Sequence, residues 1–312
     1  MLEGLKTLIH RIRGIKETYP LIPLSMRVRS YIRLIRPMTI LGAFLSGLFL
    51  DIFFSRLSPN GINFIHATLV GLSLASIHIF GQVLNQSIRE EVEIDRINSK
   101  MRPTVTGALS LKEAKRFSLI WFIFGTSIAF YLNPIYGIFS LLIAFFAVAY
   151  TIPPFRIKRF FLFNNLWQGI ARGLLPAVYV SSAYNNYGLL PIIFGVSLMI
   201  WITGAQASKD WGDTVGDRFY NIKTFPVVLG FEGTLKLMGF LMGISFLMFN
   251  LFIYLRIFPS VFLVLNLLII PSSMIILGLK HNIKLSFAEN NLSWVCFYGT
   301  LGLFYMLPAL II

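Results

Sequence analysis

The sequence predicts an all-α integral membrane protein with nine transmembrane helices. Long apolar runs, a high apolar content and a one-sided distribution of lysine and arginine lead to this prediction. Of the 312 residues, 56% are hydrophobic and 13% are charged, and the mean hydropathy is +0.74. A soluble domain of this size cannot bury so much apolar surface, whereas several apolar runs are long enough to span a bilayer.

The apolar runs follow a basic N-terminal segment. Residues 1–36 are rich in lysine and arginine, and leucine and isoleucine recur near their start at a spacing compatible with an amphipathic helix on the membrane surface. Residues 37–312 are expected to form one membrane domain. Its expected spans are 38–55, 63–86, 117–132, 134–151, 163–183, 188–208, 233–255, 259–279 and 292–312. Asn133 and Pro134 supply the turn between the third and fourth spans.

The basic residues predict how the spans are oriented. With a cytoplasmic N-terminus, nearly all lysines and arginines fall in cytoplasmic segments, and the opposite loops hold only Arg56 and Arg256. We therefore expect a multi-pass protein of the cell membrane, with its C-terminus outside. The net charge of +14 is then a topology signal and an attraction to anionic lipids, not a nucleic-acid footprint. The cytoplasmic loops are expected at 87–116, 152–162, 209–232 and 280–291.

The cytoplasmic loop after the sixth span begins with the acidic stretch KDWGDTVGD. On a helix, Asp210, Asp213 and Asp217 would share one face, at positions i, i+3 and i+7. Three like charges on one face call for a cation, and oxygen ligands without a nearby histidine or cysteine suit Mg²⁺. The alternative interpretation is a solvated acidic turn between two spans.

A second acidic stretch follows the second span. Glu91 and Asp95 are spaced i,i+4, Asn85 lies shortly upstream, and Lys100 and Arg102 follow. Two acidic clusters on one membrane face, with basic residues beside them, would suit a diphosphate. The carboxylates would hold Mg²⁺, the Mg²⁺ would hold phosphate, and lysine and arginine would take the remaining phosphate oxygens.

These motifs resemble those of the UbiA superfamily of intramembrane prenyltransferases. The pattern Lys-Asp-x-x-Asp-x-x-Gly-Asp is matched in full by Lys209, Asp210, Asp213, Gly216 and Asp217. The segment from Tyr150 to Lys158 resembles the family's Tyr-Ser-x-Pro-Pro-x-x-x-Lys, and Arg36-Pro37 also fits. The resemblance covers about residues 30–312 and implies a nine-helix bundle around a central cavity.

The first acidic stretch departs from the family pattern. The family carries Asn-Asp-x-x-Asp-x-x-x-Asp, and here Gln86 stands where the first Asp is expected. Counting back from Asp95 selects Glu91 as a ligand, but it requires two extra residues after Asn85. This departure puts the role of Asn85 in doubt and leaves Glu90 as a rival for Glu91.

The resemblance implies ionisation of an allylic prenyl diphosphate with Mg²⁺ and capture of the allyl cation by a lipophilic acceptor. It assigns metal binding to Glu91, Asp95, Asp210, Asp213 and Asp217. It assigns catalytic roles to Asp213, Asp217 and Tyr150, the acids as orienting or deprotonating groups for the acceptor. Substrate binding is expected of Asn85, Lys100, Arg102, Lys158, Arg172 and Lys209.

Three further polar residues lie inside predicted spans. Arg172, in the fifth span, binds an anionic acceptor or makes a structural pair, because charges within a membrane are usually functional or paired. His78 is expected to be a hydrogen-bonded packing residue rather than a ligand. Asp51 is expected to reach the outer membrane interface.

The resemblance allows more than one class of acceptor. The EIDRIN run and the segment after Lys223 resemble archaeal ether-lipid enzymes that prenylate geranylgeranylglyceryl phosphate, and also chlorophyll synthases. Asn85-Gln86 and Ala171-Arg172-Gly173 resemble quinone-pathway enzymes with aromatic acceptors such as homogentisate. Two other classes are an ion-coupled transporter and a noncatalytic scaffold. The transporter is disfavoured because the acids gather at one membrane face and not at midplane.

Overall fold

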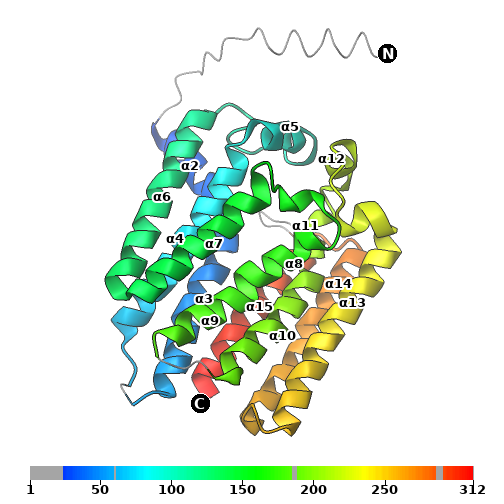
Figure 1. Ribbon diagram of the computed structural model, residues 1–312. Helices are drawn as coiled ribbons and strands as arrows, with labels where there is room; N and C mark the ends of the chain where they lie inside the picture. The colour runs from blue at the N-terminus through cyan, green and yellow to red at the C-terminus, as the bar shows by residue number, and fades with distance from the viewer. Residues whose placement is uncertain (1–23, 60, 185–187, 286–290, 312) are drawn as a thin grey trace, which may run out of the picture.

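The computed structural model describes residues 24–59, 61–184, 188–285 and 291–311, and every regular element among them is a helix. Long helices lie side by side in one bundle (Figure 1). The short helices α5 (Arg89–Asn98) and α12 (Thr214–Phe219) lie together at one end, which we call the motif end. Helix α15 (Leu292–Ile311) finishes at the opposite end. The predicted all-α membrane fold class is confirmed.

Seven helical segments among the described residues are long and apolar enough to cross a membrane. They are α3 (Pro37–Arg56), α4 (Phe64–Gln86), α7 (Pro134–Thr151), Leu189–Asp210 with α10 (Leu189–Ala205) and α11 (Ala207–Asp210), α13 (Phe225–Tyr254), Ser260–Lys280 with η3 (Ser260–Leu268) and α14 (Ile269–Lys280), and α15. The two other predicted spans coincide with α6 (Leu111–Leu132) and with the succession α8 (Phe163–Gly169), η2 (Ile170–Leu174) and α9 (Leu175–Ser182). Nine crossings therefore stay a prediction.

Two polar caps fix the ends of α6 and α7. Ser110 and Glu113 form a reciprocal capping box that starts α6. Asn133 ends α6 and caps α7, where its Oδ1 accepts a hydrogen bond of 2.8 Å from the backbone N–H of Ile135. Pro134 then occupies the first turn of α7, where a missing N–H costs nothing. The turn predicted between the third and fourth spans is confirmed.

The end of the basic N-terminal segment is a helix, α2 (Leu24–Ile35), at the motif end. Its Leu34 is buried, and the carbonyl of Leu34 accepts a hydrogen bond of 2.8 Å from Nε2 of Gln86. Arg27 pairs with Glu113 at the start of α6. The amphipathic stretch predicted closer to the N-terminus lies outside the described residues.

The succession α8–η2–α9 is a bundle helix interrupted by a π-helical turn. It packs closely against α10 at Gly173, where an added Cβ would lie 2.7 Å from the backbone nitrogen of Met199. A side chain at position 173 would therefore push the two helices apart. The π-helical turn carries Arg172, and such turns are frequent at functional sites.

The expected single helix over Asp210 to Asp217 is wrong. Helix α11 ends at Asp210, a turn follows, and α12 begins at Thr214. The turn has a physical cause, because Gly212 favours helix poorly and the Thr214 hydroxyl donates to the carbonyl of Asp210 and so competes with the helical N–H. The three aspartates consequently surround a turn instead of lining one helix face.

The expectation that Asp51 reaches the membrane interface is also wrong. Asp51 lies in the last third of α3, away from the motif end, and is 1% exposed. Its Oδ1 accepts hydrogen bonds from the hydroxyls of Tyr184 (2.9 Å) and Tyr136 (3.4 Å). Its Oδ2 lies 3.0 Å from Nδ1 of His66. A carboxylate with three partners can be buried at low cost, which explains why it does not reach the surface.

Candidate functional site

The structure brings the two acidic stretches together at the motif end. Helices α5 and α12 are in contact, and the backbone N–H of Gly216 donates a hydrogen bond of 2.9 Å to Oδ1 of Asn98. An added Cβ at Gly216 would collide with the Asn98 amide, so the approach requires glycine. This contact explains why a glycine stands between Asp213 and Asp217 in the motif.

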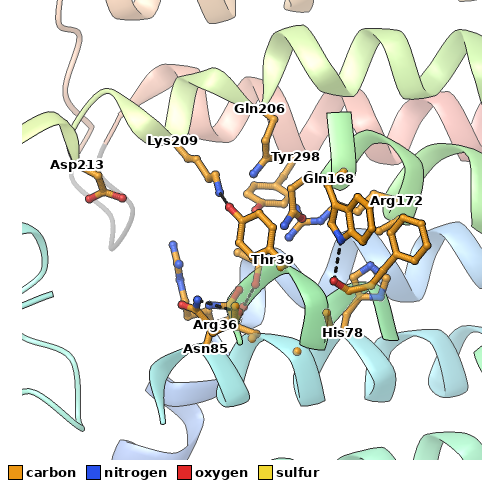
Figure 2. Close-up of a pocket in the computed structure, with 18 of the residues that line it drawn as sticks. Arg36, Thr39, His78, Asn85, Gln168, Arg172, Gln206, Lys209, Asp213 and Tyr298 are labelled. Carbon is orange, nitrogen blue, oxygen red and sulfur yellow. Dashed lines mark hydrogen bonds between the residues drawn. The ribbon is translucent and has the colours of Figure 1, made fainter. Parts of the chain in front are cut away.

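A cavity of about 300 Å³ opens between these stretches and runs into the bundle. Lys209 and Asp213 lie on one side of it, and His78 and Arg172 lie on the other (Figure 2). Its lining also includes Asn85, Arg102, Tyr150, Phe146, Trp167 and Tyr298. The cavity therefore combines a polar mouth with a partly aromatic interior.

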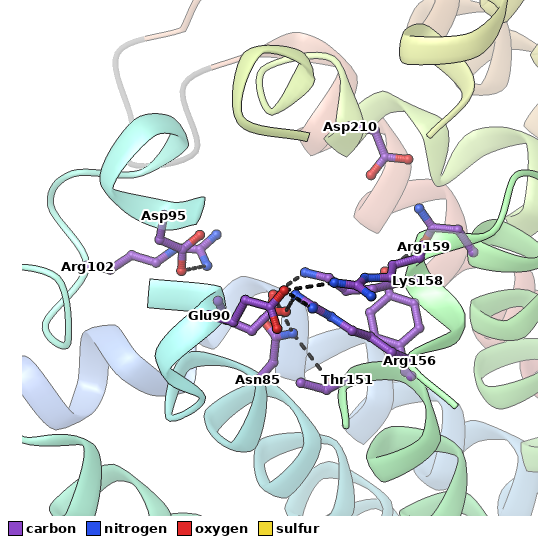
Figure 3. A network of polar contacts seen from close by, with 12 residues as sticks. Asn85, Glu90, Asp95, Arg102, Thr151, Arg156, Lys158, Arg159 and Asp210 are labelled. Carbon is purple, nitrogen blue, oxygen red and sulfur yellow. Dashed lines mark hydrogen bonds and ion pairs between the residues drawn. The ribbon is translucent and has the colours of Figure 1, made fainter. Parts of the chain in front are cut away.

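Glu91 is the inward-facing acid of the first stretch. Only 4% of its side chain is exposed, and its Oε1 lies 2.9 Å from Nη2 of Arg156. Lys158 pairs with its Oε2, and Nδ2 of Asn85 donates to the same oxygen at 3.4 Å. The ion pairs lie in one network at the motif end (Figure 3). The structure thus brings Asn85, Glu91 and Lys158 together, although two residues separate α4 from α5.

Glu90 lies on the outer side of the same network. Its side chain is 41% exposed, and it pairs with Arg159 at 2.8 Å and with Arg156. The hydrogen bond from Arg156 lowers the pKa of Glu90 more than its slight burial raises it. Glu91 is thus the buried and Glu90 the exposed acid of the network, and neither lines the cavity, so the choice between them as a ligand stays a prediction.

Asp95 lies on the same face of α5 as Glu91, and it pairs with Arg102. Burial raises the pKa of Asp95 to about 6, against the charge of Arg102, and the charges of Asp213 and Glu91 add to the increase. The effect of Asp213 shows that the two acidic stretches are electrostatically coupled.

The second stretch carries more negative charge than its surroundings neutralise. Asp210 is buried, its Oδ1 lies 3.8 Å from Nζ of Lys209, and its Oδ2 has no hydrogen-bond partner. Burial raises the pKa of Asp217 to about 8, and the charges of Asp210 and Asp213 add to this increase. Asp213 is partly exposed on the cavity wall. An unpartnered buried carboxylate oxygen beside two further carboxylates is suited to a cation.

The donor set fits Mg²⁺ in combination with a substrate. Within the described ranges, no three side chains of His, Cys, Asp and Glu lie close enough together to hold a metal ion alone. Mg²⁺ usually binds one or two carboxylates together with substrate phosphates and water. Carboxylates that cannot hold a metal alone but lie beside a substrate cavity suit this mode of binding. We define the acidic rim as Glu91, Asp95, Asp210, Asp213 and Asp217.

Tyr150 and Lys209 form a fixed pair on the cavity wall. The Tyr150 hydroxyl donates to Oδ1 of Asn164 at 2.7 Å and accepts a hydrogen bond from Nζ of Lys209 at 3.2 Å. The Lys209 nitrogen also lies 5.6 Å from the centre of the Tyr150 ring. Both side chains are thus held in place before any ligand binds.

Two expected substrate-binding residues differ in their placement. Lys100 is exposed and does not line the cavity, so its contact with phosphate stays a prediction. Arg172 does line the cavity, and its Nε is buried without a hydrogen-bond partner. The structural-pair interpretation of Arg172 is therefore weakened.

The residue that the sequence analysis missed is Arg156. It is 3% exposed and pairs with both Glu90 and Glu91. Its φ of 39° turns the chain back toward the first acidic stretch. The available signal was its position two residues before Lys158 in the segment that begins at Tyr150.

Comparison with known proteins gives a consistent picture. The model of the UbiA prenyltransferase family matches residues 40–308. Over 263 residues the chain is 26% identical to the digeranylgeranylglyceryl phosphate synthase of Saccharolobus solfataricus, covering 83% of this chain and 89% of that one. Over 228 residues it is 26% identical to the homogentisate phytyltransferase of Synechocystis, covering 68% and 73%.

A solved structure shows the same fold. The UbiA homologue from Archaeoglobus fulgidus bound to GPP and Mg²⁺ superposes with a TM-score of 0.70 at 22% identity, covering 90% of this chain and 99% of that one. This likeness supports the helical arrangement seen here.

Proposed function

Because the chain belongs to the UbiA prenyltransferase family, we propose that it transfers a polyprenyl group from an allylic prenyl diphosphate to a lipophilic acceptor, geranylgeranylglyceryl phosphate, within the membrane. The observation that carries the proposal is the meeting of the two acidic stretches beside a cavity with a partly aromatic interior, which Asp213 of the acidic rim lines. A long prenyl tail gains about 0.8 kcal/mol per buried CH₂, while its diphosphate needs cations at the interface.

The head of the donor would be bound at the rim. Asp210, Asp213 and Asp217 on one side, and Glu91 and Asp95 on the other, supply oxygen ligands for Mg²⁺. Bound there, Mg²⁺ supplies positive charge that stabilises the departing diphosphate.

The basic residues that pair with the acidic rim would bind the phosphate oxygens directly. Arg156 and Lys158 are held at Glu91, and Arg102 is held at Asp95, so these cations are positioned before the diphosphate arrives. Preorganised charge lowers the barrier because it needs no rearrangement during ionisation.

The cavity interior would protect the allyl cation. Phe146 and Trp167 stack with ring centroids 4.1 Å apart on the wall, and Tyr150 and Tyr298 also line it. Aromatic faces attract cations, and an apolar chamber keeps water from capturing the cation before the acceptor does.

The choice of acceptor is supported by the relatives and by Arg172. The Saccharolobus relative is named for a glyceryl phosphate product, and the Arg172 guanidinium, which lines the cavity with its Nε unpartnered, suits an acceptor that carries phosphate. The second candidate is an aromatic acceptor, which the Synechocystis relative favours because it is named for homogentisate.

We place the motif end in the cytoplasm, with the C-terminus outside. The basic loops after α4, α7 and α11 lie at this end, where the positive-inside rule puts them. An ion-coupled transporter is disfavoured, because α5 and α12, the helices of the two acidic stretches, lie at one end of the bundle and not halfway along it.

The test uses the purified protein in lipid nanodiscs with a panel of prenyl diphosphates and the two acceptor classes, read by mass spectrometry. We expect Mg²⁺-dependent formation of the prenylated glyceryl phosphate by the wild type and none by Asp210→Ala or Asp217→Ala. Product only from an aromatic acceptor would replace the acceptor assignment. Diphosphate release that persists unchanged in both variants would favour the transporter.

A further inference from the structure

A histidine faces the cavity two helical turns inward from the rim. His78 lies on α4 seven positions before Asn85, which places it about 10 Å deeper on the same helix face. Gly81 lies between them, and an added Cβ there would be 2.6 Å from Cβ of Ala147 on α7. The close approach of α4 and α7 at Gly81 leaves His78 on the wall of the open part of the cavity.

The hydrogen bonding of His78 determines its tautomer. Its Nδ1 lies 3.1 Å from the carbonyl oxygen of Leu74, and a carbonyl can only accept, so Nδ1 carries the hydrogen. The neutral ring then has an unprotonated Nε2, and the ring makes no other hydrogen bond within the described part of the chain. The ring is partly accessible from the cavity. Its Nε2 is therefore available to accept a proton from a ligand.

Arg172 shares this part of the wall. Together with Thr39, Tyr298 and Tyr305, both His78 and Arg172 line a small recess that continues the cavity. Arg172 makes no ion pair among the described side chains, and its Nε has no partner. Two positive charges in an apolar wall repel each other strongly, so a protonated imidazole beside an unpaired Arg172 is unfavourable. An anion bound by Arg172 offsets the guanidinium charge, and the imidazole can then hold a proton. An acceptor that carries both an anionic group and a hydroxyl meets this requirement.

We infer that His78 is the general base that takes the proton of the acceptor hydroxyl, an inference that rests on the proposed function. The bond between the donor's first carbon and its diphosphate oxygen breaks, and that carbon bonds to the acceptor oxygen. The hydroxyl proton passes to Nε2 of His78, and the diphosphate leaves with the bonding electron pair. The imidazolium afterwards loses its proton to water that enters the cavity once the products leave.

Depth separates this role from those of the rim acids. Asp213 lines the mouth and Asp217 lies in the same acidic rim, so the departing diphosphate would shield the rim side of the allyl cation and the nucleophile would approach from the interior. Reacting atoms have to come within about 3–3.5 Å of each other, so the acceptor hydroxyl lies deeper than the rim. His78 is the base available at that depth on α4.

The diagnostic variant is His78→Asn. The Asn amide nitrogen can replace Nδ1 and keep the hydrogen bond to Leu74, while the basic Nε2 is lost. We expect ether formation to fall roughly 100-fold or more, the usual range for a general base, with Mg²⁺-dependent donor binding unchanged. Diphosphate release without transfer should persist, because ionisation does not need the base.

His66→Asn is the matched control. His66 lies on the same helix, with its Nδ1 also hydrogen-bonded, but it lines neither the cavity nor the recess. We expect its ether formation per folded molecule to match the wild type. A second variant, His78→Ala, should be rescued by added imidazoles, with a rescued rate that follows their basicity.

Two results would overturn the role of His78. One is ether formation by His78→Asn at the wild-type rate. The other is a loss of donor binding in His78→Asn together with no rescue of His78→Ala, which indicates a structural role. The proposed function fails separately, if the wild type prenylates an aromatic carbon and no glyceryl phosphate. His78 is then judged on the aromatic product, since that ring must also lose a proton.

Discussion

Buried acids lie near both ends of the bundle, and their hydrogen bonding differs. At the far end from the motifs, Asp51 accepts hydrogen bonds from Tyr136 and Tyr184 and contacts His66, and it lines neither the cavity nor the recess described above. We call these four residues the outer polar cluster. At the motif end, Oδ2 of Asp210 has no partner and the rim borders a cavity.

The difference separates a structural acid from a ligand-binding acid. Asp51 accepts hydrogen bonds from side chains fixed in the fold and gains little from a cation, whereas Asp210 is buried and incompletely satisfied and is destabilised until a cation binds. Burial alone would rank Asp51 and Asp210 as equals. Their partners show which of them stabilises the fold and which awaits a ligand.

The largest effect is expected for Asp210→Asn. The variant keeps the shape of the side chain but removes its charge, so Mg²⁺-dependent diphosphate release from a radiolabelled donor should fall at least about 100-fold. Thermal stability without metal should not decrease, because a poorly compensated buried charge has been removed. A variant that releases diphosphate at the wild-type rate would remove Asp210 from the site.

Asp51→Ala should show the opposite behaviour. It leaves the donors of the outer polar cluster without an acceptor, which costs about 2 kcal/mol of stability. We expect a lower melting temperature in detergent and unchanged diphosphate release per folded molecule. Loss of activity without loss of stability would mean that the outer polar cluster also serves the reaction.

Glu91 and Glu90 provide the same comparison within one helix. Glu91→Gln leaves Arg156 and Lys158 without their buried counter-charge, and we expect donor affinity in Mg²⁺ to fall about 10-fold. Glu90→Gln changes an exposed pair, which contributes at most about 1 kcal/mol, and is the control. Titration of a fluorescent prenyl diphosphate measures both variants, and equal effects would contradict the assignment of Glu91.

The last prediction concerns the pH dependence of metal binding. Burial raises the pKa of Asp95 to about 6 and that of Asp217 to about 8, and Mg²⁺ needs both acids deprotonated. Affinity for Mg²⁺ should therefore increase roughly 100-fold between about pH 6 and 8 and level off above about pH 9. Calorimetry in buffers of different ionisation heat should detect proton release below pH 8, and its absence would contradict the shared site.

The same shifts fix the sign of a stability change. An acid with a raised pKa holds its proton more tightly in the folded state than in the unfolded state, so the metal-free protein should lose stability as pH rises toward 8. Mg²⁺ with a bound diphosphate should restore that stability.

The sequence predicts the bundle and the composition of the rim because both follow from local patterns. Apolar runs mark the spans, and the spacing of Glu91 and Asp95 places them on one face of a real helix, α5. The prediction of one helix from Asp210 to Asp217 was wrong because residue spacing says nothing about the Thr214 hydroxyl. This hydroxyl donates to the carbonyl of Asp210 in place of a helical N–H, and the helix ends there.

Long-range partners are the part that the sequence could not provide. The donors that bury Asp51 come from positions far along the chain, Tyr136 and Tyr184, and no local pattern indicates that they meet. For the same reason the sequence left Arg156 unassigned, since its role depends on Glu91 in another segment. The sequence also predicted a hydrogen-bonded His78, which agrees with its contact to Leu74, but only the structure shows that His78 lines a cavity.

The most direct test of the shared rim is the binding of a non-reactive prenyl thiodiphosphate by calorimetry, with and without Mg²⁺. Asp95→Asn represents the first acidic stretch and Asp217→Asn the second. If the two stretches together hold one metal–diphosphate group, the wild type should bind the analogue only with Mg²⁺, and each variant should lose most of that affinity. Binding of the analogue without Mg²⁺, or binding at wild-type affinity by either variant, would contradict a shared metal–diphosphate site.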